Sequence, residues 1–130
     1  MTQPLQTAGF ANLTGAWVAS ATPPKYIQYG TGTGAAQSAN ALVTPASNEV
    51  RTSGTLSQQQ TTLANDTYQV LGTVTCATAG KTITEVGVFD AAGSGGPPPT
   101  GGNMDIYGNF SGIALNVGDS IAFTIKVAFS

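Results

Sequence analysis

The chain has 130 residues, only 8% of them charged, and a formal net charge of −2, whereas about a quarter of the residues in an average soluble domain are charged. The chain has only four cationic residues, too few for a basic surface that binds a nucleic-acid backbone or for a basic amphipathic segment that binds lipid. We therefore expect neither nucleic acid nor a membrane as a partner. Histidine is absent, which removes the commonest general base and the commonest metal ligand.

A single amphipathic helix is predicted near the start of the chain, over residues 7–19 (TAGFANLTGAWVA). Phe10, Leu13 and Trp17 fall at positions i, i+3 and i+7, and Thr7 is the expected N-cap. This apolar stripe is expected to dock onto a sheet or onto a neighbouring subunit.

Glycines weaken this helix, because Gly9 and Gly15 each cost up to ~1 kcal/mol relative to alanine in a helix interior. The helix therefore needs packing to persist. Pro23 and Pro24 end it, since proline lacks the N–H donor and disfavours helical geometry in the preceding residue. We assign residues 1–24 to an N-terminal arm and helix, and residues 25–130 to a single β domain.

The β domain shows short strand patterns separated by turn signals about every 8 to 12 residues, the spacing typical of a sandwich or barrel. The fold class predicted is mainly β: an antiparallel β-sandwich or partly open barrel with one short N-terminal helix. Strands are expected at residues 26–29, 49–63 (one strand, or two joined at Gly54), 68–76, 82–90, 104–110, 112–117 and 120–129.

Two features of these strands bear on their pairing. The strands at 68–76 and 82–90 are separated by a short turn, so we expect them to pair as an antiparallel hairpin. Apolar residues occupy both faces of 82–90, which indicates either a strand covered on both sides or a register shift at Gly87.

The last strand carries a regular apolar row on one face: Ile121, Phe123, Ile125, Val127 and Phe129. Side chains alternate along a strand, so this face is built to be buried. The strand either pairs within its own sheet or lies at an edge where a neighbouring molecule covers it.

Residues 91–102 (AAGSGGPPPTGG) have no apolar anchor and contain too much glycine and proline for a helix or a strand. This segment is predicted to be a surface loop, stiffened by Pro97, Pro98 and Pro99.

Catalytic groups are not apparent, and we expect neither enzyme activity nor a cofactor or metal. A serine triad has no imidazole to use, and the lone Cys76 can form neither an intrachain disulfide nor a cysteine-based metal site. Asp66 and Asp119 are best explained by turn chemistry. The six carboxylates are scattered singly, at Glu49, Asp66, Glu85, Asp90, Asp105 and Asp119.

The order of several segments carries a resemblance. TAGFANLTGAWVAS is followed by PKYIQYGTGTG and NEVR, and later by KTITEVGVFDA and LNVGDSIAFTIKVAFS. This series resembles small virion proteins of tailed bacteriophages: a leading helix, a strand ending in a Gly-Thr-Gly-Thr turn, a Glu-x-x-Arg-like segment, and a closing strand opened by Gly-Asp-Ser. The resemblance implies a capsid decoration (cement) protein or a tail fibre or other tail component, made in the host cytoplasm and located on the virion.

We favour decoration of the capsid, because a chain of 130 residues lacks the repetitive shaft expected of a fibre. The expected partners are copies of the chain itself, as a trimer, and the major capsid protein. The expected contact residues are the arm Thr2 to Leu5, the helix face with Phe10, Leu13 and Trp17, and the loop with Pro97, Pro98 and Pro99. The rival hypothesis is a receptor- or glycan-binding module that uses Tyr26, Tyr29 and Tyr107 together with the glycine- and proline-rich loop.

Overall fold

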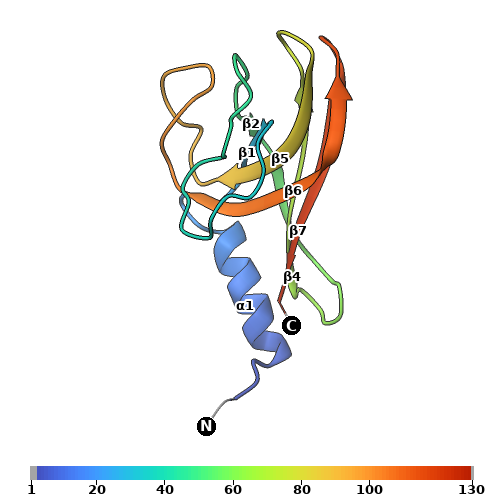
Figure 1. Cartoon of the computed structure of the whole chain (residues 1–130). Coiled ribbons are helices and arrows are strands. Elements are labelled where there is room, and N and C mark those ends of the chain that lie inside the picture. Colours follow the sequence, from blue (N-terminus) through green and yellow to red (C-terminus); the bar gives the residue numbers. More distant parts are fainter. Residues whose placement is uncertain (1–2, 130) are drawn as a thin grey trace.

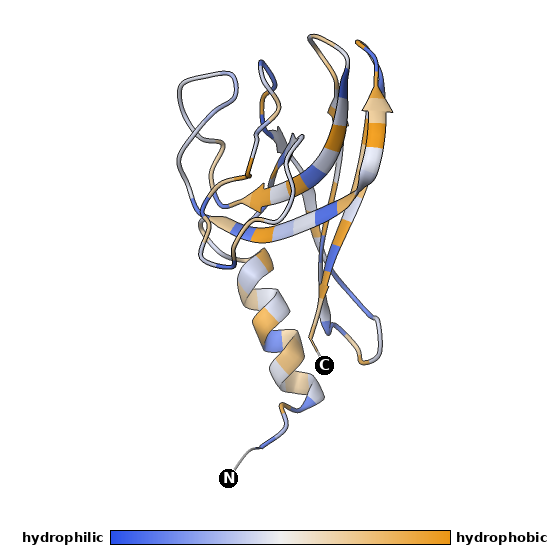
Figure 2. Ribbon diagram, in the orientation of Figure 1, coloured by the Kyte–Doolittle hydropathy of each residue, from blue (hydrophilic) through white to orange (hydrophobic). Residues whose placement is uncertain are grey.

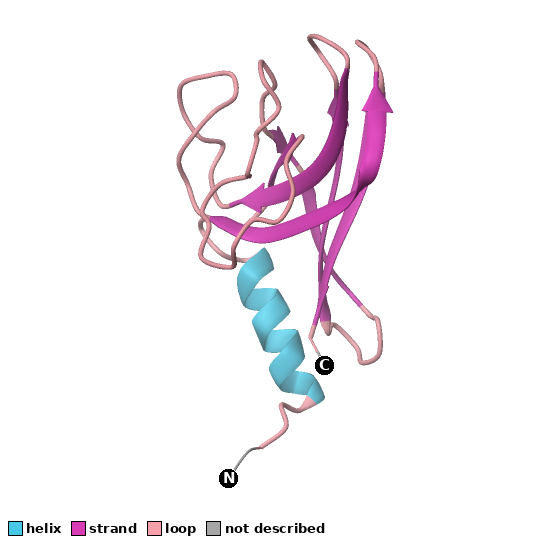
Figure 3. Ribbon diagram, viewed as in Figure 1, coloured by secondary structure: helices cyan, strands magenta, loops and turns pink. Residues whose placement is uncertain are grey.

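The chain folds as two antiparallel sheets packed with one helix, as a computed structural model of residues 3–129 describes it (Figures 1 and 3). Met1, Thr2 and Ser130 lie outside the described residues. The elements are α1 (Thr7–Val18), β1 (Tyr26–Gly30), β2 (Thr52–Ser53), β3 (Thr55–Gln59), β4 (Thr67–Thr75), β5 (Lys81–Phe89), β6 (Met104–Leu115) and β7 (Ser120–Ala128). The described strands form two antiparallel sheets and no closed barrel, so the predicted fold class, mainly β with one short helix, is confirmed and the arrangement is sandwich-like.

We call the first sheet sheet A, with strand order β2-β1-β5-β6, and the second sheet B, with order β3-β4-β7. Gly54 lies between β2 and β3, so the segment that could have been one strand is two strands in different sheets. A Cβ at Gly54 would lie 2.6 Å from a methyl group of Val70. Only glycine therefore fits where the chain crosses between the sheets.

The core lies between the two sheets and consists of alternate residues from each strand. Apolar and polar bands alternate along the strands in Figure 2. The buried core residues are Ile27, Tyr29, Ala46, Tyr68, Val70, Val74, Cys76, Ile83, Val86, Val88 and Leu115, and the row Ile121, Phe123, Ile125 and Val127 of β7 packs against them.

The expected hairpin between the strands at 68–76 and 82–90 is wrong. Strand β4 pairs with β3 and β7, whereas β5 pairs with β1 and β6. The connection after β4 instead carries the chain from sheet B to sheet A. This crossing places two apolar faces, with Val70 on β4 and Val88 on β5, in the same core, which a hairpin within one sheet could not do.

A register shift explains the apolar residues on both faces of β5, and it lies at Thr84 rather than at Gly87. Ile83 pairs with Ile113 and Glu85 with Asn109, so one residue of β5 faces three of β6. The bulge turns Val86 and Val88 inward after Ile83. Strand β6 is consequently one bulged strand, not the two predicted, and a second shift follows between Val88 and Phe89.

Helix α1 packs on the part of sheet B that sheet A leaves uncovered, as Figure 1 shows. The Trp17 ring meets Tyr68 edge-on at a centroid distance of 5.0 Å and Phe129 at 6.1 Å. The helix ends at Val18, and its N-cap is Gln6 rather than Thr7, with no side-chain cap. The extended backbone at Gln6 places its carbonyl to accept from the N–H of Phe10 at 3.1 Å.

The inward stripe of α1 consists of the buried Phe10 and Thr14 and the half-buried Trp17, while Leu13 is 46% exposed. Thr14 is fully buried because its hydroxyl donates to the Asn65 carbonyl at 2.7 Å and accepts from Gln58 at 2.8 Å. Phe10, Leu13 and Trp17, which were expected to form one partner-binding face, therefore do not lie on the same surface. Phe10 and Trp17 pack within the molecule, and Leu13 faces outward.

Replacement of Trp17 by alanine is expected to lower the free energy of unfolding by about 2–4 kcal/mol, because it removes the main anchor of α1 from a half-buried site. Leu13→Ala on the same helix is expected to change it by less than about 0.5 kcal/mol. Urea titration of both variants checks the difference. Equal losses would show that α1 does not dock through Trp17.

Candidate functional site

The contact residues predicted from the sequence lie at two separate ends of the molecule. Figure 1 shows the start of α1 near the C-terminal end of β7, while the 91–102 loop lies at the other end. Leu5 and Phe10 therefore belong to one surface, and Pro97–Pro99 belong to another.

An apolar groove is formed where the arm, the helix and the end of β7 meet, and we call it the terminal groove. It encloses about 340 Å³ and is lined by Pro4, Leu5, Phe10, Thr62, Leu63 and Phe129. Leu5 and Leu63 are 47% and 37% exposed, whereas Phe10 is buried. None of the lining residues is ionisable, so a partner that docks there displaces water without desolvating a charge.

One wall of the terminal groove is fixed by Asp66, which is 1% exposed. Its carboxylate accepts hydrogen bonds from the backbone N–H groups of Thr61, Thr62 and Leu63 at 2.7 to 2.8 Å. These donors hold the pKa of Asp66 well below its usual range. The turn role predicted for Asp66 is confirmed, and so is that of Asp119, which accepts from the N–H of Asn116 at 2.8 Å.

The loop over residues 91–102 is clamped at its base by Arg51. The guanidinium lies 3.6 Å from the centroid of the Phe89 ring and donates to the carbonyls of Ala91 at 2.9 Å and Gly101 at 2.8 Å. Asp90 adds a second clamp, because it accepts from the backbone N–H and the side chain of Asn103. The only sequence signal for this anchor was that Arg51 is one of just four cationic residues.

The tip of this loop carries the three prolines. A bridge between Ser94 and Thr100 spans it. Pro97 is exposed, while Pro98 and Pro99 are half-buried, and the Pro99 carbonyl lies 3.5 Å from the amide nitrogen of Gln28. The loop thus offers Pro97 to solvent, and the contact role of these prolines stays a prediction.

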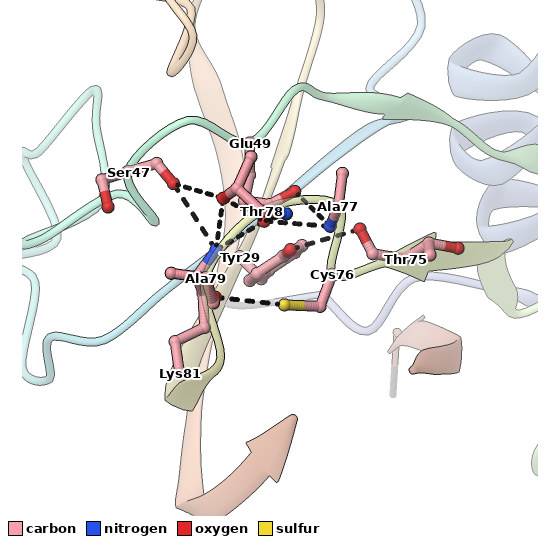
Figure 4. Close-up of polar contacts among 9 residues, drawn as sticks. All are labelled: Tyr29, Ser47, Glu49, Thr75, Cys76, Ala77, Thr78, Ala79 and Lys81. Carbon is pink, nitrogen blue, oxygen red and sulfur yellow. Dashed lines mark hydrogen bonds and ion pairs between the residues drawn. The ribbon is translucent and has the colours of Figure 1, made fainter. Parts of the chain in front are cut away.

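A buried ionic cluster joins the segment before β2 to the β4–β5 connection and the start of β5 (Figure 4). Lys81 and Glu49 form an ion pair at 2.5 Å, with side chains only 9% and 4% exposed. Glu49 also accepts from the N–H groups of Ala77 and Thr78. Burial alone would raise the pKa of Glu49, but Lys81 and these donors lower it to about 2.

Glu85 is a third buried carboxylate, with no exposed surface. It accepts from the backbone N–H groups of Gly32, Val43 and Thr44 at 2.8 to 3.1 Å. Glu85 therefore holds the 31–44 loop against the outer face of sheet A. The loop therefore covers this face of β5 as well, in addition to the register shift that turns Val86 and Val88 into the core.

Asp66, Glu49 and Glu85 each anchor a loop by accepting hydrogen bonds from its backbone N–H groups. Among residues 3–129, no group of three or more histidine, cysteine or acidic residues is placed to hold a metal ion. Cys76 is buried. Over the same range, no helix combines the length and the apolar character that crossing a bilayer requires.

The tyrosines considered for sugar binding do not form one surface. Tyr29 is 2% exposed and belongs to the core, where burial and the nearby Glu49 raise its pKa. Tyr26 and Tyr107 are half-buried. The buried hydroxyl of Tyr107 has no hydrogen-bond partner in the described part of the chain.

Comparison with known proteins gave no match to a family model, a curated protein sequence or a solved structure. The sandwich assignment therefore rests on the strand pairing described above.

Substitution of Glu49 by glutamine is expected to lower the free energy of unfolding by about 2–4 kcal/mol at neutral pH, because Lys81 stays buried without its anion. Asp105→Asn removes the same charge from an exposed residue and is expected to have little effect. The check is guanidinium denaturation of the two variants and the parent protein.

The same variants test the acid response. The pKa of Glu49 is about 2 in the folded chain and 4.5 as its ordinary value, so the unfolded state binds more protons between these values. Stability from Glu49 is complete above about pH 5 and is lost as the pH falls toward 2. Glu49→Gln should flatten this loss, and an unchanged acid slope would contradict the role of the pair.

Arg51→Lys is expected to loosen the 91–102 loop, because lysine cannot both stack on Phe89 and donate to two carbonyls. Cleavage within the loop by a non-specific protease should accelerate at least about fivefold, while the far-ultraviolet circular dichroism stays that of the parent. An unchanged cleavage rate would show that Arg51 does not hold the loop.

Proposed function

We propose that the protein is a non-enzymatic virion structural protein that decorates a phage capsid and bridges adjacent major capsid subunits. The terminal groove is the observation that carries this proposal, because it is an exposed apolar surface without an ionisable group. The order of segments that resembles small phage virion proteins supplies the class of partner.

The distribution of charge supports a docking role. Of the four cationic and six acidic residues, only Asp105, Asp119 and Lys126 are exposed. Interface cores are depleted in charged residues, since a buried charge without a partner is costly to desolvate. A surface with so few charges suits contact with another protein over a wide area.

Bridging needs two separate contacts on one molecule, and the two ends of this molecule offer them. The terminal groove with Leu5 and Leu63 is the first, and the clamped loop with Pro97 is the second. Rigid loops and preformed grooves lose little conformational entropy on binding. The trimer expected from the sequence is a separate prediction, and the two capsid contacts proposed here do not depend on it.

The rival functions receive less support. A glycan-binding surface built on three tyrosines loses Tyr29, which lies in the core. A tail component would use the same terminal groove, so imaging particles with and without this chain separates capsid from tail.

Leu63→Glu is expected to abolish binding to empty shells of the major capsid protein encoded in the same genome, because it places a charge in the terminal groove. Val117→Glu, at a 61% exposed position in the β6–β7 turn, is the matched control and should bind like the parent. Co-sedimentation with the shells measures both. Equal binding of the two variants, or no binding by the parent chain, would overturn the proposal.

A further inference from the structure

Strand β7 forms a long open edge of sheet B. It pairs with β4 along its whole length, from Thr67 opposite Ala128 to Thr75 opposite Ser120, without a register shift. Its other side pairs with no strand in residues 3–129, since β7 ends the strand order of its sheet. Figure 1 shows β7 running from the turn after β6 down to the C-terminus, with the end of β6 beside its upper part.

The hydrogen bonds to β4 show which backbone groups of β7 face the open side. Asp119 accepts from the N–H of Cys76, and the N–H of Phe129 donates to Asp66, both at 2.9 Å. In an antiparallel pair, alternate residues direct both backbone groups toward the same neighbour. The open side therefore carries the N–H and C=O groups of Ser120, Ala122, Thr124, Lys126 and Ala128.

This edge lacks most of the devices that keep sheet edges apart. Proteins protect open edges with prolines, bulges, short strands or several charges. Strand β7 has no proline and no bulge, and Lys126 is its only charge. The other edges are better protected, because β2 and β3 are short and β6 is bulged.

We propose that β7 pairs antiparallel with β7 of a second copy of this chain, about a two-fold axis that passes through Thr124. In this register Thr124 lies opposite Thr124 of the second copy, Ala122 opposite Lys126, and Ser120 opposite Ala128. All residues of Ser120–Ala128 are then paired. The open backbone groups of one copy meet those of the other, and the two sheets B become one continuous sheet.

The side chains fit the same register. On the inner face, Phe123 lies opposite Ile125 and Ile121 opposite Val127, and all four are half-buried in a single copy. Strand β4 flanks these four side chains on one side only, and β7 of the second copy would flank them on the other. On the outer face the paired side chains are small, apart from Lys126.

Charge also permits this register. The two Lys126 residues lie on opposite sides of the axis, because each is opposite Ala122 of the other copy. They are separated by four residue positions along the strands, which is about 13 Å at roughly 3.3 Å per residue. This separation exceeds the Debye length of about 8 Å at physiological ionic strength. Each lysine faces an alanine, so no like charges are opposed.

The inference rests on β7 alone and stands or falls separately from the capsid role. A two-fold contact is self-complementary and joins copies in twos. It therefore gives a dimer where the sequence-based expectation was a trimer, and the measured mass distinguishes the two.

The first test removes the open backbone donor. The mass of the purified chain, measured by sedimentation and light scattering across the micromolar range, should be that of a dimer. Thr124→Pro removes an N–H that β4 does not use, as tolerated on edge strands, and should yield monomers with the circular dichroism of the parent. The control Thr124→Val keeps the N–H and should stay dimeric.

The second test fixes the register without touching the backbone. Ala122→Glu places a carboxylate opposite Lys126 of the second copy and should tighten the dimer by about two- to thirtyfold at low salt, since each pair occurs twice. Ala122→Lys opposes like charges and should weaken it by a similar factor. Thr55→Glu, on the outer face of β3 at the other edge of sheet B, is the matched control and should have no effect.

A monomeric or trimeric parent chain would overturn the proposal. So would a dimer that survives Thr124→Pro with its fold intact, or equal dimer affinities for the two Ala122 variants. In each case the capsid role would still be tested separately through Leu63→Glu.

Discussion

The structure depends on three buried carboxylates that fix its loops to its sheets. Glu49, Asp66 and Glu85 are between 0% and 4% exposed, and each accepts hydrogen bonds from successive or neighbouring backbone N–H groups of a loop. A buried anion is tolerated only when such donors surround it, so each carboxylate restricts its loop to one conformation. The long connections of this sandwich are thereby held in place although they contain few apolar residues.

This internal use of charge has a consequence for the surface. With half of the acidic residues buried, little charge remains outside, and the terminal groove, the clamped loop and the open edge of β7 are almost uncharged. Such surfaces favour association through apolar burial and backbone hydrogen bonds, because neither requires a charge to lose its hydration. The proposed contacts with a capsid and with a second copy both follow from this property.

The fold class followed from the sequence because strand periodicity and turn residues are local signals. The pairing of the strands did not, since the path after β4 is decided by which faces pack together. A register shift in β5 was one of the two alternatives predicted, but it was placed at Gly87 instead of Thr84. No particular residue type marks the position of a register shift. The helix stripe was wrong at Leu13, because the inward position is taken by Thr14, whose burial depends on the Asn65 carbonyl and Gln58, two groups distant in sequence. The clamp by Arg51 likewise joins distant residues and could not be predicted from spacing.

The most direct test of the buried-carboxylate account is native-state hydrogen exchange of the loop amides at neutral pH. The account predicts that the N–H groups of Gly32, Val43 and Thr44, which donate to Glu85, exchange as slowly as the amides of neighbouring strands, and that Glu85→Gln makes them exchange faster. Loop amides ordinarily exchange quickly. Exchange at the rate of an unstructured peptide in the parent chain would contradict the account.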